Sequence, residues 1–274
     1  MRMALLQGVC VVILGIYLAR RLRTGPGERR VALRRLGLLA LASWVGEDSL
    51  IRAYGFYRYA AGWALFVDQV PLLIVGIWPV VVDSAWRLAG HLVRGPRAVA
   101  LVGGCLVLTD AALIEPIAVA AGLWSWSEPG LFGVPPIGML GWAVFAAGAI
   151  ALLEQRRMPG WVAVLVLPLW VHVVLVAAWW GLLRWVSAPL PGWAVAAGAW
   201  AVAVPLTVWI GWRRPWVPVG ELMVRLPAAA FFFALLGLSG GPVLAAYALA
   251  FVPPYLALMR GSLARSAPQV PEGT

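Results

Sequence analysis

The chain has 274 residues, of which 63 % are hydrophobic and only 12 % are charged. This composition leaves too little polar surface for a soluble globule, and no polar stretch between the apolar runs is long enough to build a separate soluble domain. All 21 basic residues are arginine and the net charge is +10, but the arginines stand in short loops between apolar runs. We therefore interpret them as membrane-orientation signals and expect no nucleic-acid partner.

The apolar runs predict an all-α, polytopic transmembrane helical bundle. We expect one integral domain over residues 1–260 and a disordered cytoplasmic tail over 261–274. About nine spans are predicted, near residues 3–19, 36–53, 70–90, 98–121, 134–153, 160–183, 192–212, 226–238 and 241–259. Eight spans are the alternative, because the last two runs are short and meet at a Ser-Gly-Gly-Pro turn signal, where they form either a hairpin or one broken helix.

Arginine placement gives the expected orientation. The first run is followed, not preceded, by strong positive charge and has no small-residue cleavage site, so it is interpreted as a retained span. Basic segments occur at every second connection: Arg20 to Arg35, Arg87 to Arg97, Arg156-Arg157, Arg213-Arg214, and the tail with Arg260 and Arg265. This alternation favours nine spans in a bacterial inner membrane, with the N-terminus outside and the C-terminus in the cytoplasm.

Arg52 and Arg58 are exceptions on the outer side, where they either contact the motif described next or snorkel to lipid headgroups.

One pattern occurs twice, within residues 44–90 and 105–150. It is an acid, a glycine seven residues later, aromatics two and four after the glycine, then Val-Pro, and a tryptophan seven after the proline. The copies are Asp48, Gly55, Tyr57, Tyr59, Val70-Pro71, Trp78 and Glu115, Gly122, Trp124, Trp126, Val134-Pro135, Trp142. Both copies have the same predicted orientation, which indicates a parallel internal repeat about an axis along the membrane normal. An interfacial aromatic belt requires no such fixed spacing, so we expect the rings to line one substrate pocket.

Three acids are candidate catalytic residues: Glu115, Asp110 and Asp48. Carboxylates in apolar spans are unfavourable, so they usually face the bundle interior and have a role. The repeat matches Asp48 with Glu115, and Asp110 has no arginine nearby in the sequence. For Asp83, an i, i+4 ion pair with Arg87 is an equally good explanation. A protonated acid in an apolar pocket can donate a proton to a substrate at neutral pH.

Metal and cofactor chemistry have little support in the sequence. Cys10 and Cys105 lie in separate apolar runs, where we expect packing rather than a disulfide. His172 and His91 are isolated, so no metal site and no cofactor are predicted; His172 is interpreted as a helix-packing residue, with a proton relay as the alternative. The chain has no phosphate-binding loop, dinucleotide fingerprint, nucleophile elbow or Asp-rich diphosphate motif, which disfavours ATP-driven transport, nicotinamide chemistry and prenyl transfer.

The motif resembles the membrane carotenoid-biosynthesis proteins that include CruF-type carotenoid 1,2-hydratases. The resemblance covers about residues 44–145 and rests on Asp110-x4-Glu115-Pro116, Gly122 to Trp126, Phe132 to Pro135 and Trp142, with Tyr54 to Tyr59, Val70-Pro71 and Trp78 in the first half. It implies cofactor-independent addition of water to the terminal 1,2 double bond of an acyclic carotenoid taken from the bilayer. Glu115 or Asp110 would protonate C-2, Asp48 would orient water, and the aromatic rings would hold the tertiary cation at C-1.

Two alternatives remain open. The small integral lycopene cyclases share the pattern loosely but usually have a Glu pair after the second proline, where this chain has Pro136-Ile137-Gly138; the hydratase family often has Asn at position 138. A cyclase or isomerase would use the same protonation and capture the cation with an internal alkene. A transporter or non-catalytic scaffold would be indicated by an inverted repeat, whereas these copies are parallel.

Overall fold

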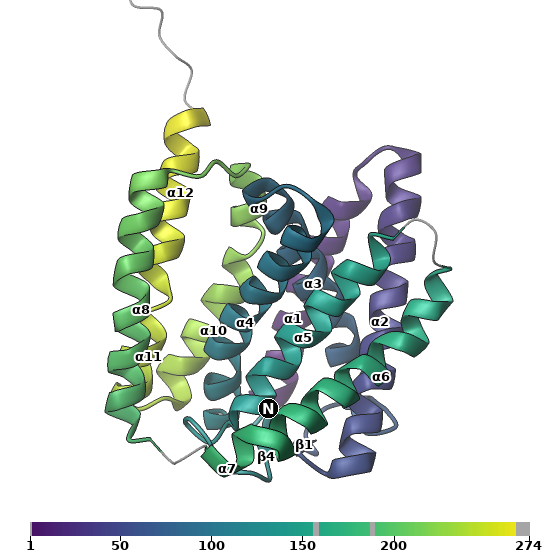
Figure 1. Ribbon diagram of the computed structural model, residues 1–274, viewed down its shortest axis with the longest axis vertical. Helices are drawn as coiled ribbons and strands as arrows, with labels where there is room; N and C mark the ends of the chain where they lie inside the picture. The colour runs from purple at the N-terminus through teal and green to yellow at the C-terminus, as the bar shows by residue number, and fades with distance from the viewer. Residues whose placement is uncertain (1, 156–158, 187–189, 267–274) are drawn as a thin grey trace, which may run out of the picture.

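The computed structural model describes residues 2–155, 159–186 and 190–266, and these form an all-α bundle (Figure 1). The helices are α1 (Arg2–Leu22), α2 (Pro26–Tyr54), α3 (Leu72–Leu92), α4 (Pro96–Ala120), α5 (Pro136–Leu153), α6 (Gly160–Ala178) with the π-helical turn η1 (Trp179–Leu183) and α7 (Arg184–Val186), α8 (Gly192–Arg213), α9 (Val219–Met223), α10 (Leu226–Ser239), α11 (Pro242–Leu249) and α12 (Val252–Ser266). Short strands β1 (Tyr57–Tyr59), β2 (Phe66–Val67), β3 (Val70–Pro71) and β4 (Trp124–Trp126) occupy the connections.

The protein is a multi-pass membrane protein. Within the described ranges, eight helices are long and apolar enough to cross a membrane. The ninth, α2, has 29 residues but carries Glu47, Asp48 and Arg52 in its apolar stretch. Consecutive helices α9 and α10 make one span, as do α11 and α12, so the predicted nine-span bundle is confirmed.

The last two spans are separate elements. Helix α10 ends at Ser239, α11 begins at Pro242, and α11 and α12 pack along α8 rather than extending α10 (Figure 1). Helix α12 continues to Ser266, so residues 261–266 are helical and not part of a disordered tail. The remainder of the predicted tail, 267–274, and the Arg156-Arg157 pair lie outside the described residues.

Helices α4 and α5 approach closely because α4 has two consecutive glycines at the contact. A Cβ atom on Gly104 would lie 2.9 Å from the Cβ of Ala147 and 3.0 Å from the carbonyl oxygen of Ala143. A Cβ atom on Gly103 would lie 2.3 Å from Cδ1 of Ile150. Small residues at such contacts let helix backbones approach in a membrane, where dispersion drives packing. This contact holds α5, which carries Trp142, against α4, which carries Glu115.

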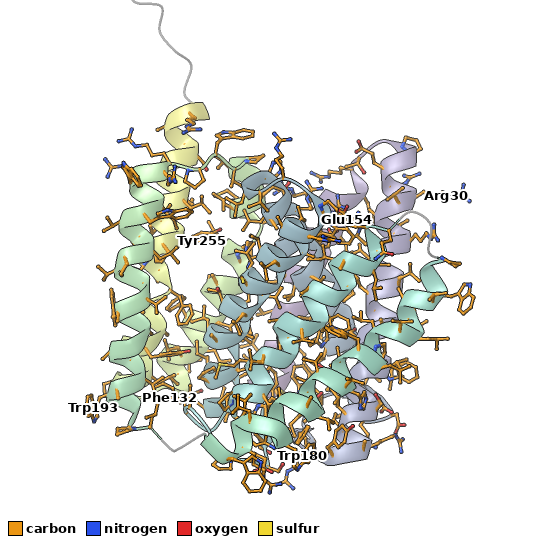
Figure 2. All side chains as sticks on the ribbon, in the orientation of Figure 1. Arg30, Phe132, Glu154, Trp180, Trp193 and Tyr255 are labelled. Atoms are coloured by element: carbon orange, nitrogen blue, oxygen red, sulfur yellow. The ribbon has the colours of Figure 1, made fainter. Side chains whose placement is uncertain are left out.

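Charge is concentrated at one end of the bundle. Figure 2 shows Arg30 and Glu154 at this arginine-rich end and Trp180 and Trp193 at the opposite end, where β1 and β4 lie. Asp83 is fully buried near the arginine-rich end and accepts hydrogen bonds from other helices.

The predicted Asp83–Arg87 pair does not form. Asp83 is 2.8 Å from Nε of Arg21 on α1 and 3.4 Å from Nη1 of Arg35 on α2. Arg87 instead binds Glu221 on α9, with 2.9 Å between its Nε and Oε2. The interior position of Asp83 faces α1 and α2, whereas Arg87 lies where α9 packs on α3. These ion pairs join four spans at the arginine-rich end.

Candidate functional site

The two motif copies meet in a pair of antiparallel strands. Strand β1 pairs with β4 so that Tyr57 lies opposite Trp126 and Tyr59 lies opposite Trp124. Each strand follows a glycine in the left-handed region, Gly55 at φ 60° and Gly122 at φ 72°, a conformation that side chains disfavour. An antiparallel pair formed by equivalent segments is related locally by a twofold axis, as the repeat predicts.

The later part of each copy starts a helix. Val70 and Val134 are both fully buried, and Pro71 and Pro135 stand at the N-caps of α3 and α5. Proline is well tolerated at the beginning of a helix, where its missing N–H removes no helical bond. The two helices then carry Trp78 and Trp142, whose rings pack with their centroids 4.6 Å apart.

Glu115 is surrounded by indole donors. Its Oε2 accepts hydrogen bonds from Nε1 of Trp124 at 2.7 Å and of Trp126 at 3.0 Å. Its Oε1 accepts one from Nε1 of Trp142 at 2.8 Å. Glu115 is only 2 % exposed, so every aromatic residue of the second copy contributes its N–H to one buried carboxyl group.

Glu47, not Asp48, occupies the matching position in the first copy. Its oxygens accept hydrogen bonds from Nε1 of Trp78 and from the Tyr59 hydroxyl. Trp78 is the repeat partner of Trp142, so Glu47 is the structural counterpart of Glu115. The spacing of the repeat had matched Glu115 with Asp48, which is the next residue along α2.

The one-residue difference arises at the helix ends. The N–H of Gly55 bonds the carbonyl of Ile51, four residues back, whereas the N–H of Gly122 bonds that of Val119, three residues back. In α4 the N–H of Leu123 also bonds the carbonyl of Ala118, five residues back, as in a Schellman motif. The two helices therefore end differently, and Glu47 is eight residues before its glycine whereas Glu115 is seven before its own.

Asp48 lies outside this carboxyl pair. Its Oδ2 is 3.0 Å from Nε of Arg52, and its Oδ1 accepts a bond from the backbone N–H of Gln69 at 3.1 Å. Arg52 also pairs with Asp68, and Arg58 reaches Ser125 at 3.3 Å. Asp48 thus holds the loop between β1 and α3 in place.

Asp110 also lies in a different cluster. It forms an ion pair with Arg225, whose Nη1 donates to the Ser84 hydroxyl at 2.9 Å. This pair joins α4 to the beginning of α10. The sequence could not indicate it, because the two partners are 115 residues apart.

The carboxyl pair opens on an apolar cavity of about 160 Å³. Six aromatic residues predicted to bind substrate all line it, together with the two acids: Tyr57, Tyr59, Trp78, Trp124, Trp126, Trp142, Glu47 and Glu115. The remaining walls come mainly from apolar side chains of α1, α3, α5 and α10. The predicted substrate-binding rings therefore share one cavity, and of the three predicted catalytic acids only Glu115 belongs to it.

The two tyrosines of β1 differ in their bonding. Burial, with a further contribution from Glu47, raises the pKa of both hydroxyl groups well above the ordinary value for tyrosine. The Tyr59 hydroxyl is bound to Glu47. The Tyr57 hydroxyl makes no hydrogen bond within the part of the chain that the structure describes, and its ring packs on Trp126 with 4.7 Å between centroids. Tyr57 therefore offers the cavity a neutral hydroxyl group that can donate or accept.

Gly138 makes room for Trp126. A Cβ atom at position 138 would lie 2.6 Å from Cζ2 and 2.7 Å from Cη2 of the Trp126 indole, far inside van der Waals contact. Since the same indole donates to Glu115, a larger residue at 138 would displace one of the three donors. Glycine here has a structural reason in this chain.

His172 links two helices outside the cavity. Its Nε2 is 2.8 Å from the Ser49 hydroxyl and its Nδ1 is 2.9 Å from the Tyr54 hydroxyl, which ties α6 to α2. Among the described residues, no group of three or more His, Cys, Asp or Glu side chains could hold a metal ion.

Comparison of the chain with protein-family profiles, with curated proteins and with solved structures found no match.

Proposed function

We propose that this protein is an acid–base enzyme of carotenoid biosynthesis that hydrates the terminal 1,2 double bond of an acyclic carotenoid. The observation that supports this proposal best is the pair of buried carboxyl groups, Glu47 and Glu115, in one apolar, ring-lined cavity. A trisubstituted alkene needs a proton donor to form a tertiary cation, and aromatic faces stabilise such a cation. The resemblance of the motif to carotenoid 1,2-hydratases names the substrate class.

The hydrogen bonds support different roles for the two acids. An indole N–H can only donate, so three of them around Glu115 match a carboxylate, which only accepts. The Tyr59 hydroxyl beside Glu47 can donate or accept, so that bond persists when Glu47 carries a proton. We assign proton donation to Glu47 and electrostatic stabilisation of the cation to Glu115.

Water then adds to the double bond in two steps. Glu47 gives its proton to C-2, the π bond breaks, and positive charge develops at C-1. A water molecule held by the free Tyr57 hydroxyl forms the new C–O bond at C-1 and loses a proton to a carboxylate of the pair. The product differs from the substrate by one water, and no redox partner is needed.

Cyclisation is the second candidate, because most of the cavity wall is apolar and no acid or amide stands at position 138 to hold water. The same cation would then be captured by an internal alkene and lose a proton without a change in mass. We further propose a bacterial inner-membrane location with the arginine-rich end in the cytoplasm, as the positive-inside rule suggests.

The test is expression in a lycopene-producing bacterium, with pigments analysed by mass. We expect a product heavier than lycopene by one or two waters. Glu47→Gln is expected to lower its formation by about 10²-fold or more, as for loss of a general acid, and Glu115→Gln by a similar factor, as for loss of an electrostatic stabiliser. Asp48→Asn is the matched control beside Glu47 and is expected to keep the activity.

Three outcomes would contradict the proposal. A product of unchanged mass would favour the cyclase. Unaltered pigments with well-inserted protein would exclude lycopene hydration. The hypothesis of a transporter or non-catalytic scaffold would then remain. Full activity of both Glu variants would exclude the carboxyl pair as the acid–base machinery.

A further inference from the structure

The cavity has one wall made of lipid-facing helices. Its inner end is lined by buried side chains such as Trp78 and Phe145, beside the carboxyl pair. Its other side is lined by Ile13 and Leu14 of α1 and by Phe231 and Phe232 of α10, which are only partly buried. Helices α1 and α10 contact each other, so the seam between them separates the cavity from the bilayer.

The polar contacts of helix α1 with the rest of the bundle lie near its two ends. Near its beginning, Gln7 bonds the carbonyl of Gly62 and the N–H of Ala64, at 3.2 and 2.8 Å. Near its end, Tyr17 and Arg21 bind Asp83 at 2.7 and 2.8 Å. Residues 8–16 form no side-chain hydrogen bond to the rest of the described chain, which leaves a purely apolar stretch of about 13 Å at the helical rise.

Helix α10 has a similar arrangement. It is anchored at its beginning, where Arg225 binds Asp110 and Ser84. From residue 226 to 239 its side chains make no hydrogen bond among the described residues, and only Leu235 and Leu236 are buried. The apolar parts of α1 and α10 that face each other can therefore separate slightly without breaking a polar contact.

The size of the cavity limits what can enter. At about 160 Å³ it is close to the engineered cavity of about 150 Å³ that holds one benzene molecule. A carotenoid is many times longer than such a ring. Only an end group therefore fits beside the carboxyl pair, and the rest of the polyene must leave the cavity through an apolar wall.

We propose that the polyene enters laterally from the bilayer between α1 and α10, places one end group in the cavity, and keeps its conjugated chain in this seam against Leu14, Phe231 and Phe232. This inference rests on the proposed function for the identity of the ligand, but not for the route. It makes these three residues specificity-determining positions remote from the acids.

The native Cys10 can be used to test this route by chemical labelling. It has two cysteines, both free; Cys10 of α1 lines the cavity, whereas Cys105 is exposed on α4. In vesicles containing the full-length Cys105→Ala variant, we expect prolonged incubation at alkaline pH with a ring-sized maleimide such as N-phenylmaleimide to label Cys10, which reacts slowly because it is only 8 % exposed. Lycopene at ten times its Kd should slow this labelling about 11-fold, because only the free protein reacts. The Cys10→Ala variant reports Cys105, whose labelling should not change.

A second experiment narrows the seam between α1 and α10. Leu14→Trp, in the Cys105→Ala background, should raise the lycopene concentration needed for protection about tenfold or more, since the indole occupies the path. Ile16→Trp is the matched control, because Ile16 is on the same helix, is 49 % exposed and does not line the cavity.

The outcomes separate the two proposals. If lycopene protects Cys10 but no hydrated pigment forms, the seam is supported and the hydratase is rejected. If hydrated pigment forms while Cys10 stays unprotected, or Leu14→Trp behaves like Ile16→Trp, the seam is rejected and the hydratase stands. If neither protection nor product is seen, both are rejected.

Discussion

Replacing Trp142 by phenylalanine tests the electrostatic role of the indole ring system around Glu115. The change keeps an aromatic ring in the packing with Trp78 and removes one N–H donor, the one that bonds Oε1 of Glu115 at 2.8 Å. Trp124 and Trp126 share the other oxygen, so no remaining donor replaces it.

The expected effect follows from the value of a hydrogen bond to a charged group, about 1.5–3 kcal/mol. If the transition state depends on Glu115 as a carboxylate beside the developing cation, the loss lowers the rate about 10- to 150-fold. The phenyl ring is smaller than the indole, so the change also loosens the packing with Trp78. Thermal unfolding reports this loss of packing, and the rate at saturating lycopene reports the loss of the N–H group.

The assay is the initial rate of hydrated pigment formation in vesicles with saturating lycopene, together with thermal unfolding in detergent. Trp209→Phe is the control, because Trp209 is 50 % exposed and makes no hydrogen bond among the described residues. A Trp142→Phe rate equal to that of Trp209→Phe would refute the reasoning. A lower rate accompanied by an equal loss of folded protein would refute it too.

Three further changes have defined outcomes. Gly138→Ala should push the Trp126 indole from its place and lower the hydration rate about tenfold or more, as for loss of a bond to a charged group; an unchanged rate would show that Trp126 can relax. Asp110→Ala leaves Arg225 without its carboxylate, so the free energy of unfolding should fall by about 3 kcal/mol, and unaltered thermal unfolding would contradict this. Because its folded pKa is raised by burial and neighbouring acids, Tyr59 stabilises the fold below about pH 10 and this contribution declines as the pH rises further; Tyr59→Phe should therefore flatten the alkaline fall in stability, measured by unfolding between pH 9 and 11.

Much of the fold follows from hydropathy alone. Nine apolar runs with arginine-rich ends predict the nine helices, because an uncharged stretch of about 20 residues has few alternatives to a spanning helix. The motif spacing also predicts that Tyr57, Tyr59, Trp124 and Trp126 come together, since the glycines and prolines on either side fix the turns. These features depend on local sequence.

The acids depend on details that spacing does not encode. Glu47 and Asp48 are adjacent, and α2 and α4 end with different hydrogen-bond patterns, so equal spacing to the glycine selects the wrong one of the two. Only the structure separates them, because Trp78 and Trp142 are matched in the repeat and each bonds its own acid. The pairing of Asp110 and the contribution of α1 and α10 to the cavity are long-range contacts, which no local pattern reveals.

The strand pair β1–β4 also has a consequence for how the protein tolerates change. Its three residue pairs alternate between faces, with Arg58 and Ser125 exposed and the four aromatic residues directed to the cavity. Inserting or deleting a single residue between Gly122 and Trp124 would reverse the parity of β4 alone, so Trp124 and Trp126 would turn away from the cavity and Ser125 would turn toward it. Inserting two residues would preserve the parity. The number of residues between Gly122 and Trp124 can therefore change only by an even number, whatever those residues are.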